Sequence, residues 1–225
     1  MSTHTGFEAL AQGAILSPFT RLARLLEGIP PGHEKVIELT VGDPKERMPD
    51  FVIDRMAEAK ELLGTYPKIR GSDELRKAIA GWIERRYGLT GRIDPAREII
   101  PINGSREGLF YAMLPAVGRK RVQGRPVVLL PNPFYHTYLG AAYATNCDPY
   151  FLNATEATGH LPDLGALERE TDILERTVAF YLCSPANPQG AVASTSYTLK
   201  ALELARRYDF MLFFDECYSE IYTGE

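Results

Sequence analysis

The sequence is short of cysteine, and its three cysteines lie far apart, at positions 147, 183 and 217. An odd number at such wide spacing supports neither a disulfide framework nor a zinc site. We therefore expect no metal centre, and we interpret Cys183 and Cys217 as small buried apolar residues.

Long apolar runs and clusters of positive charge are lacking too. No stretch approaches the roughly 20 consecutive apolar residues that span a bilayer, and the first four residues lack the basic start of a signal peptide. The net charge is −4, and the one short basic run, residues 119–121, is interpreted as a solvated loop. Binding to duplex nucleic acid requires a basic face. We therefore expect a cytoplasmic protein that binds neither a membrane nor nucleic acid.

The hydrophobic pattern changes near residue 97. Before it, helices are predicted near residues 17–28, 50–63 and 72–88, with a short extended stretch at 36–41. After it, strands are predicted at 97–102, 126–131, 148–152, 177–183 and 209–215, alternating with helices near 105–117, 134–145, 163–170 and 194–208. This alternation predicts an α/β fold, with a mostly parallel sheet and helices on both faces.

Polar residues follow four of these predicted strands, at residues 103–106, 131–138, 184–190 and 215–218. In open α/β sheets, ligands bind at the carboxyl ends of the strands. The four segments bring a Gly-Ser helix start, an aromatic loop, an amide and a carboxylate–phenol pair to one edge. These groups suit an aromatic, phosphorylated, nitrogen-containing ligand.

Each of these features also has an ordinary structural interpretation. Ser105 after Gly104 can be a simple helix cap, and the sequence has neither a dinucleotide fingerprint nor a P-loop. Asp215 can form an ion pair, Asn187 can hold a turn, and Tyr135 can pack in a loop. No single residue decides the function.

Four motifs, taken in order, give the chain a family resemblance. They are Tyr66-Pro67-x-x-x-Gly71 with Leu75-Arg76-x-Ala78-Ile79, Asn103-Gly104-Ser105-x-Glu107, Ser184-Pro185-x-Asn187-Pro188-x-Gly190, and Asp215-Glu216-x-Tyr218. Over residues 17–225 the chain resembles the class I/II aminotransferases, fold-type I enzymes that use pyridoxal 5′-phosphate (PLP). Residues 39–45, 131–135, 183–185 and 215–222 are similar to the subgroup that acts on N-succinyl-LL-diaminopimelate in lysine biosynthesis.

The resemblance implies roles for four residues around the cofactor ring. Asp215 would pair with the pyridine nitrogen and keep it protonated, so that the ring can take up electrons. Asn187 and Tyr218 would hydrogen-bond the phenolic oxygen, and Tyr135 would stack on the ring face.

It also implies roles at the phosphate and at the substrate. Ser105 and the backbone at Arg106 would hold the phosphate, with Gly104 permitting close approach. Gly42 lies where the family contacts the substrate carboxylate. Tyr66 would reach the phosphate of a neighbouring subunit, which implies a homodimer.

The chain departs from the family pattern in two ways. Gln189 and Ala186 differ from the residues usual in the Asn187 turn, but neither replaces a proposed cofactor ligand. The family's Schiff-base lysine follows the Asp-x-x-Tyr strand, whereas the last lysine here is Lys200, on a predicted helix and expected at the surface. We therefore assign no catalytic residue, and expect the chain by itself to be inactive. Residues 1–45 would form an N-terminal arm with part of a small domain, and 46–225 an incomplete PLP-binding large domain.

The leading hypothesis is amino transfer between succinyldiaminopimelate and 2-oxoglutarate, a small-molecule amino donor and a 2-oxo acid. An aromatic or kynurenine-type aminotransferase, or a C–S lyase, is an alternative on the same fold. A non-catalytic binding or structural fragment is an alternative of another class.

Overall fold

A computed structural model describes residues 18–37, 42 and 46–221 of the chain. The chain divides into two compact units. One consists of Met1–Arg24 with Asn103–Glu225, and the other of Leu25–Ile102. The predicted domain boundary after residue 45 stays a prediction, and each unit is described below by itself.

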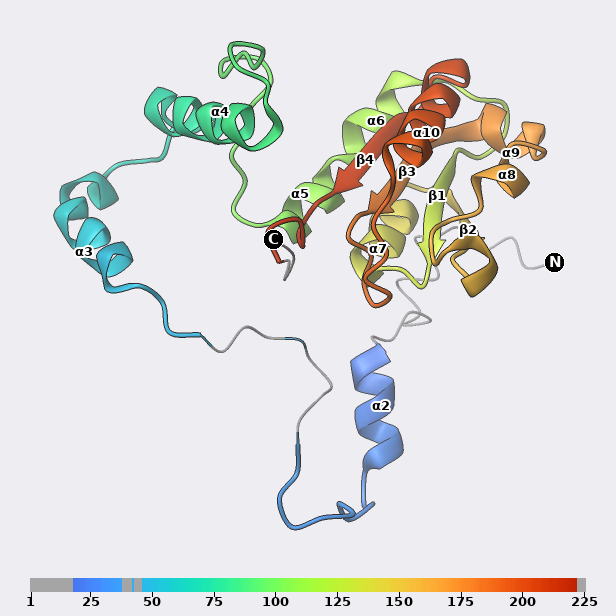
Figure 1. The fold of residues 1–225 in the computed structure, drawn as a ribbon, viewed down its shortest axis with the longest axis horizontal. Coiled ribbons are helices and arrows are strands. Elements are labelled where there is room, and N and C mark those ends of the chain that lie inside the picture. The colour runs from blue at the N-terminus through green and yellow to red at the C-terminus, as the bar shows by residue number, and fades with distance from the viewer. Residues whose placement is uncertain (1–17, 38–41, 43–45, 222–225) are drawn as a thin grey trace. The chain divides into compact units, whose positions relative to one another are not determined.

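The larger unit contains a four-stranded parallel sheet (Figure 1). Its strands are β1 (Val127–Asn132), β2 (Asp148–Asn153), β3 (Thr177–Cys183) and β4 (Met211–Asp215), in the spatial order β2-β1-β3-β4. The α/β class and the parallel sheet are confirmed, and these four strands lie within two residues of their predicted bounds at each end.

Helices cover both faces of this sheet. They are α5 (Ser105–Tyr111), α6 (Met113–Arg119), α7 (His136–Ala144), α8 (Leu164–Leu167), α9 (Thr171–Arg176) and α10 (Thr195–Arg207), with a short 3₁₀ helix, η2, at Glu156–Thr158. Leu129 of β1 packs in a core with side chains of α8, α9 and α10. Its neighbours Val128 and Leu130 pack in a second core with α6 and α7. The alternation explains why β1 is apolar along its length: both faces of the strand are buried.

The predicted strand at 97–102 is wrong. These residues form turns and irregular structure. Of their isoleucines, Ile99 is buried, while Ile100 and Ile102 are exposed. Pro101 has no N–H to donate to a ladder. Apolar residues without a neighbouring strand therefore do not form a strand here.

Two predicted helices differ from their predicted bounds in the structure, one by division and one by shortening. The helix expected at 105–117 breaks at Ala112 into α5 and α6. Pro115 explains the break, because proline has no backbone N–H: this is tolerated in the first turn of a new helix but removes a hydrogen bond from the interior of a continuous one. The helix expected at 163–170 is shorter, ending at Leu167, and α9 follows separately.

The smaller unit is helical in its described part. It contains α3 (Asp50–Glu58), the 3₁₀ helix η1 (Lys60–Gly64) and α4 (Asp73–Tyr87), and α2 (Pro18–Leu26) spans the division between the units. The Ser72 hydroxyl caps α4 by accepting from the backbone N–H of Leu75 at 3.1 Å. Asp50 is the first residue of α3, and Pro49 occupies the N-cap position.

Parts of two sequence predictions lie outside the described residues. They are residue 17 of the helix predicted near 17–28 and residues 38–41 of the extended stretch. Among the described residues, no helix is both long enough and apolar enough to cross a membrane.

Candidate functional site

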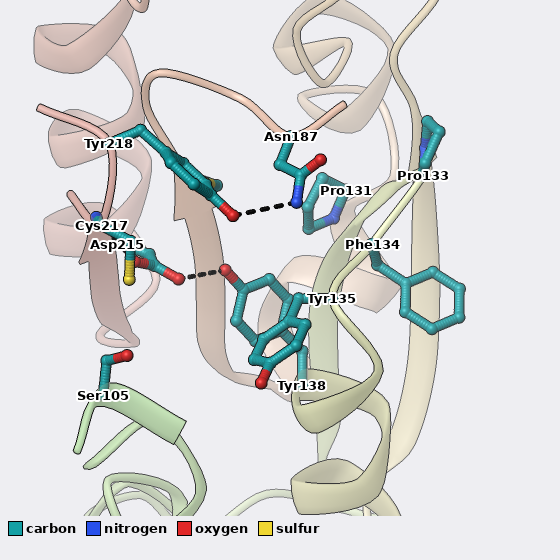
Figure 2. A pocket seen from close by; sticks show the side chains of 11 residues that line it. Ser105, Pro131, Pro133, Phe134, Tyr135, Tyr138, Asn187, Asp215, Cys217 and Tyr218 are labelled. Carbon is teal, nitrogen blue, oxygen red and sulfur yellow. Dashed lines mark hydrogen bonds between the residues drawn. The ribbon is translucent and has the colours of Figure 1, made fainter. Parts of the chain in front are cut away.

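A cavity of about 190 Å³ opens at the carboxyl ends of the strands (Figure 2). It lies where the chain leaves β1 towards one side of the sheet and β3 towards the other, the position at which α/β sheets bind ligands. Five residues predicted from the sequence line it together: Ser105, Tyr135, Asn187, Asp215 and Tyr218.

Asp215 is the buried charged group of this cavity. It ends β4 and is only 7% exposed. One carboxylate oxygen, Oδ2, accepts from the Tyr138 hydroxyl at 2.5 Å, and the other, Oδ1, accepts from the backbone N–H of Cys217 at 3.1 Å. Both donors are uncharged. The carboxylate keeps further lone pairs with which to receive a cationic N–H from a ligand in the cavity.

Asn187 and Tyr218 form a polar pair beside Asp215. The side-chain amide of Asn187 donates to the Tyr218 hydroxyl oxygen at 3.0 Å, as Figure 2 shows. Burial raises the pKa of the Tyr218 phenol. The phenol therefore stays protonated near neutral pH, with its own hydrogen left to donate to a ligand oxygen.

Tyr135 is held in place by Arg106. The Arg106 Nε–H donates to the Tyr135 hydroxyl at 2.9 Å, so the Arg106 side chain contacts a lining residue although it does not line the cavity itself. The Tyr135 ring also meets the Tyr138 ring edge to face, with centroids 5.7 Å apart. A ring fixed on two sides can provide a flat surface for an aromatic ligand.

The N-terminal turn of α5 brings backbone N–H groups to the same cavity. Ser105 is its first residue and Gly104 its N-cap. The first N–H groups of a helix have no partner within it, and they favour a negative group. A Cβ at Gly104 would come within 2.8 Å of a Glu107 carboxylate oxygen, so a side chain there would displace its neighbour.

Six other residues line the cavity, and the sequence motifs assign a role to none of them: Pro131, Pro133, Phe134, Tyr138, Cys183 and Cys217. Tyr138 follows Tyr135 by three positions at the start of α7, and this helical spacing was the signal that could have found it. Cys183 and Cys217 were interpreted as buried apolar residues. That interpretation is wrong, because Cys183 is only partly buried and Cys217 is exposed, at strand ends where the chain leaves the core.

Gly42 and Tyr66 belong to the smaller unit, and both are exposed there. Their roles at the substrate and at a neighbouring phosphate stay predictions. Lys200 is at the surface, as predicted, where its amine forms an ion pair with Glu168 at 3.0 Å.

The basic run at 119–121 is not simply a solvated loop. Arg119 ends α6 and pairs with Asp209, and the partly buried Lys120 amine donates to the backbone carbonyls of Thr177 and Tyr208. These carbonyls lie near the amino ends of β3 and β4, so the run joins α6 to the sheet.

Comparisons with known proteins agree with this geometry. The family profile described as aminotransferase class I and II matches residues 34–225. The LL-diaminopimelate aminotransferase of Moorella thermoacetica is 35% identical over 208 residues, which cover 90% of this chain and 51% of that protein. The enzyme of the same name from Desulforudis audaxviator is 35% identical over 207 residues, covering 90% and 50%.

Solved structures give the same result. An aminotransferase from Neisseria meningitidis superposes with a TM-score of 0.83 at 35% identity, covering 93% of this chain and 52% of that one. The aminotransferase AspB from Helicobacter pylori has a TM-score of 0.83 at 32% identity, covering 94% and 53%.

The fold and site define a fold-type I PLP protein. The chain belongs to the class I and II aminotransferase family, whose members use pyridoxal phosphate. It spans about half the length of the curated relatives it matches.

The donors and acceptors of the cavity fit this cofactor. A buried carboxylate at Asp215 suits a protonated pyridine nitrogen, and the Asn187–Tyr218 pair suits the phenolic oxygen. Tyr135 suits the ring face, and the start of α5 at Ser105 suits the phosphate.

Proposed function

We propose that this chain provides the cofactor-binding part of a PLP-dependent aminotransferase. The observation that carries the proposal is Asp215, a buried carboxylate at the end of an apolar strand. A charge there is costly to bury without a partner. A protonated pyridine nitrogen in the cavity would supply that partner.

Four lining residues of the cavity have a part in this function. Bound PLP supplies an electron-accepting ring. Asp215 holds the proton on the ring nitrogen, and Tyr218, positioned by Asn187, donates to the phenolic oxygen. Tyr135, held by Arg106, covers a ring face and excludes water from it.

The substrate is proposed from the relatives. The first of them are named LL-diaminopimelate aminotransferase, which points to a diaminopimelate donor and to lysine biosynthesis. The N-succinyl form of this donor, with 2-oxoglutarate as acceptor, is the finer hypothesis. Dimerisation through Tyr66, substrate contact at Gly42 and a cytoplasmic location belong to the same proposal.

Two comparisons test it on the protein that contains this chain. Asp215→Asn should abolish measurable transamination, whereas Asp209→Asn, at an exposed aspartate paired with Arg119, should leave it unchanged. Substantial turnover by Asp215→Asn would contradict the role at the pyridine nitrogen.

The second comparison concerns the amino donor. Steady-state rates with LL-diaminopimelate, N-succinyl-LL-diaminopimelate and aromatic amino acids should favour one of the two diaminopimelate forms, and their ratio decides between these. A preference for aromatic donors would contradict the substrate while leaving the aminotransferase chemistry intact.

A further inference from the structure

Tyr138 connects the buried carboxylate to the interior of the sheet. Its side chain is 1% exposed, and its hydroxyl donates to Asp215 Oδ2 at 2.5 Å (Figure 2). Its ring stacks on the ring of Tyr181 in β3, with centroids 4.4 Å apart and planes 11° from parallel. Hydroxyl and ring are therefore both fixed, one by Asp215 and the other by Tyr181.

Tyr181 extends this connection to α5. It is fully buried, and its hydroxyl donates to the backbone carbonyl of Leu109 at 2.6 Å. Leu109 belongs to α5, the helix that begins at Ser105. The stacked pair, Tyr138 on Tyr181, thus links Asp215 to α5.

We propose that Tyr138 is a positioning residue that holds the Asp215 carboxylate in the orientation needed to pair with the pyridine nitrogen, and that Tyr181 positions α5 for the phosphate. The proposal rests on the proposed PLP function and assigns roles to two residues that lie outside the motif roles.

The geometry around Asp215 explains why one hydroxyl matters. Each carboxylate oxygen accepts one hydrogen bond from the protein, Oδ1 from the Cys217 N–H and Oδ2 from Tyr138. Without the Tyr138 hydroxyl, the Cys217 N–H alone would orient the carboxylate. The buried Oδ2 would lose its donor, which costs more free energy for a charged group than for a neutral one. Burial, followed by the hydrogen bond to Asp215, raises the pKa of the Tyr138 phenol, so it remains a donor throughout the neutral range.

Two matched variants separate the role of Tyr138 from that of Tyr181. Tyr138→Phe and Tyr181→Phe each remove one buried hydroxyl and keep the stacked ring. We expect Tyr138→Phe to weaken the binding of PLP and of phosphate-free pyridoxal by the same factor, about 10-fold. Tyr181→Phe should weaken the binding of PLP while leaving that of pyridoxal nearly unchanged. Both ligands are titrated into the full chain and followed by absorbance.

The same substitution in an Asp215→Asn chain tests whether the loss of PLP affinity depends on the Asp215 carboxylate or only on the packing of Tyr138. If Tyr138 acts through Asp215, Tyr138→Phe should have no further effect on PLP affinity in an Asp215→Asn chain. The double variant also keeps the test available should Tyr138→Phe alone fail to fold, because without the buried charge the lost hydroxyl costs less. Circular dichroism of each variant checks the fold.

The outcomes distinguish the two levels of the proposal. Equal PLP affinity of wild type and Tyr138→Phe, or the same loss in both backgrounds, overturns the positioning role and leaves the proposed function standing. A wild-type chain that binds neither PLP nor pyridoxal overturns both.

Discussion

The Asn187 amide donates to the Tyr218 hydroxyl at 3.0 Å, across 31 positions of sequence. Asn187 lies in the loop after β3, and Tyr218 follows β4, so the two neighbouring parallel strands bring them together. The bond fixes the phenol oxygen as an acceptor. Its hydrogen is thereby available to donate to a ligand in the cavity, while Asn187 is the donor within the pair.

Removing that hydroxyl should weaken cofactor binding. Tyr218→Phe keeps the ring and deletes one hydrogen bond, which contributes about 1 kcal/mol, or roughly 5-fold in affinity. The measurement is a PLP titration followed by absorbance. Tyr111→Phe, at an exposed tyrosine of α5, is the control and should bind as wild type does. Equal affinity of Tyr218→Phe and wild type would show that the phenol does not donate to the cofactor.

The sequence predicted well those features that depend on local pattern. The bounds of β3, 177–183, were predicted correctly, because a run of buried apolar residues between polar segments is a local signal. The positions of Asn187, Asp215 and Tyr218 at one cavity followed from the rule that parallel strands end at the same edge.

Features that depend on tertiary partners could not be predicted in this way. Residues 97–102 have the composition of a strand, but a strand also needs a neighbour to pair with. The sequence does not distinguish Tyr138 from its neighbouring aromatic residues, because nothing local indicates a hydrogen bond to a residue 77 positions away. Lys120 looked solvated for the same reason: its carbonyl partners belong to distant segments.

Lys120 should contribute more to stability than an ordinary surface lysine. Its amine donates to the carbonyls of Thr177, at 2.9 Å, and Tyr208, at 2.5 Å. Lys120→Met leaves both carbonyls without this donor, at a cost of about 1–3 kcal/mol in the free energy of unfolding. Lys200→Met removes an exposed ion pair with Glu168 and should cost at most about 1 kcal/mol. Urea unfolding of both variants measures the difference, and equal losses would contradict the bridging role.

Cys183 should react slowly with alkylating reagents at neutral pH. Burial, followed by the nearby Asp215 charge, raises the pKa of its thiol to about 11, and the thiolate is the reactive form. The rate of iodoacetamide labelling, read from the Cys183 peptide by mass spectrometry, should therefore rise with pH until about 11.

The same shift has a consequence for stability. Between the ordinary thiol pKa of 9.0 and the folded value of about 11, the unfolded chain loses its proton while the folded chain keeps it. The contribution of Cys183 to the free energy of unfolding is thus fully present below pH 9, and it declines as pH rises through this interval. Rapid labelling of Cys183 at pH 7 in the folded protein would contradict both expectations.

Gly71 should tolerate a side chain less well than Gly88, which has a similar positive φ. Its φ is +72°, and a Cβ there would lie 2.8 Å from Pro101 Cγ. Gly88, the C-cap of α4, has a φ of +65° and no heavy atom within 4 Å of its added Cβ. Gly88→Ala therefore costs only the strain of an alanine in the left-handed backbone region, about 1–2 kcal/mol in the free energy of unfolding. Gly71→Ala adds a steric clash with the rigid ring of Pro101. Hydrogen exchange of the α4 amides should show greater loss of protection in Gly71→Ala, and the reverse order would mean that the loop at residues 65–71 moves away from Pro101 at little cost.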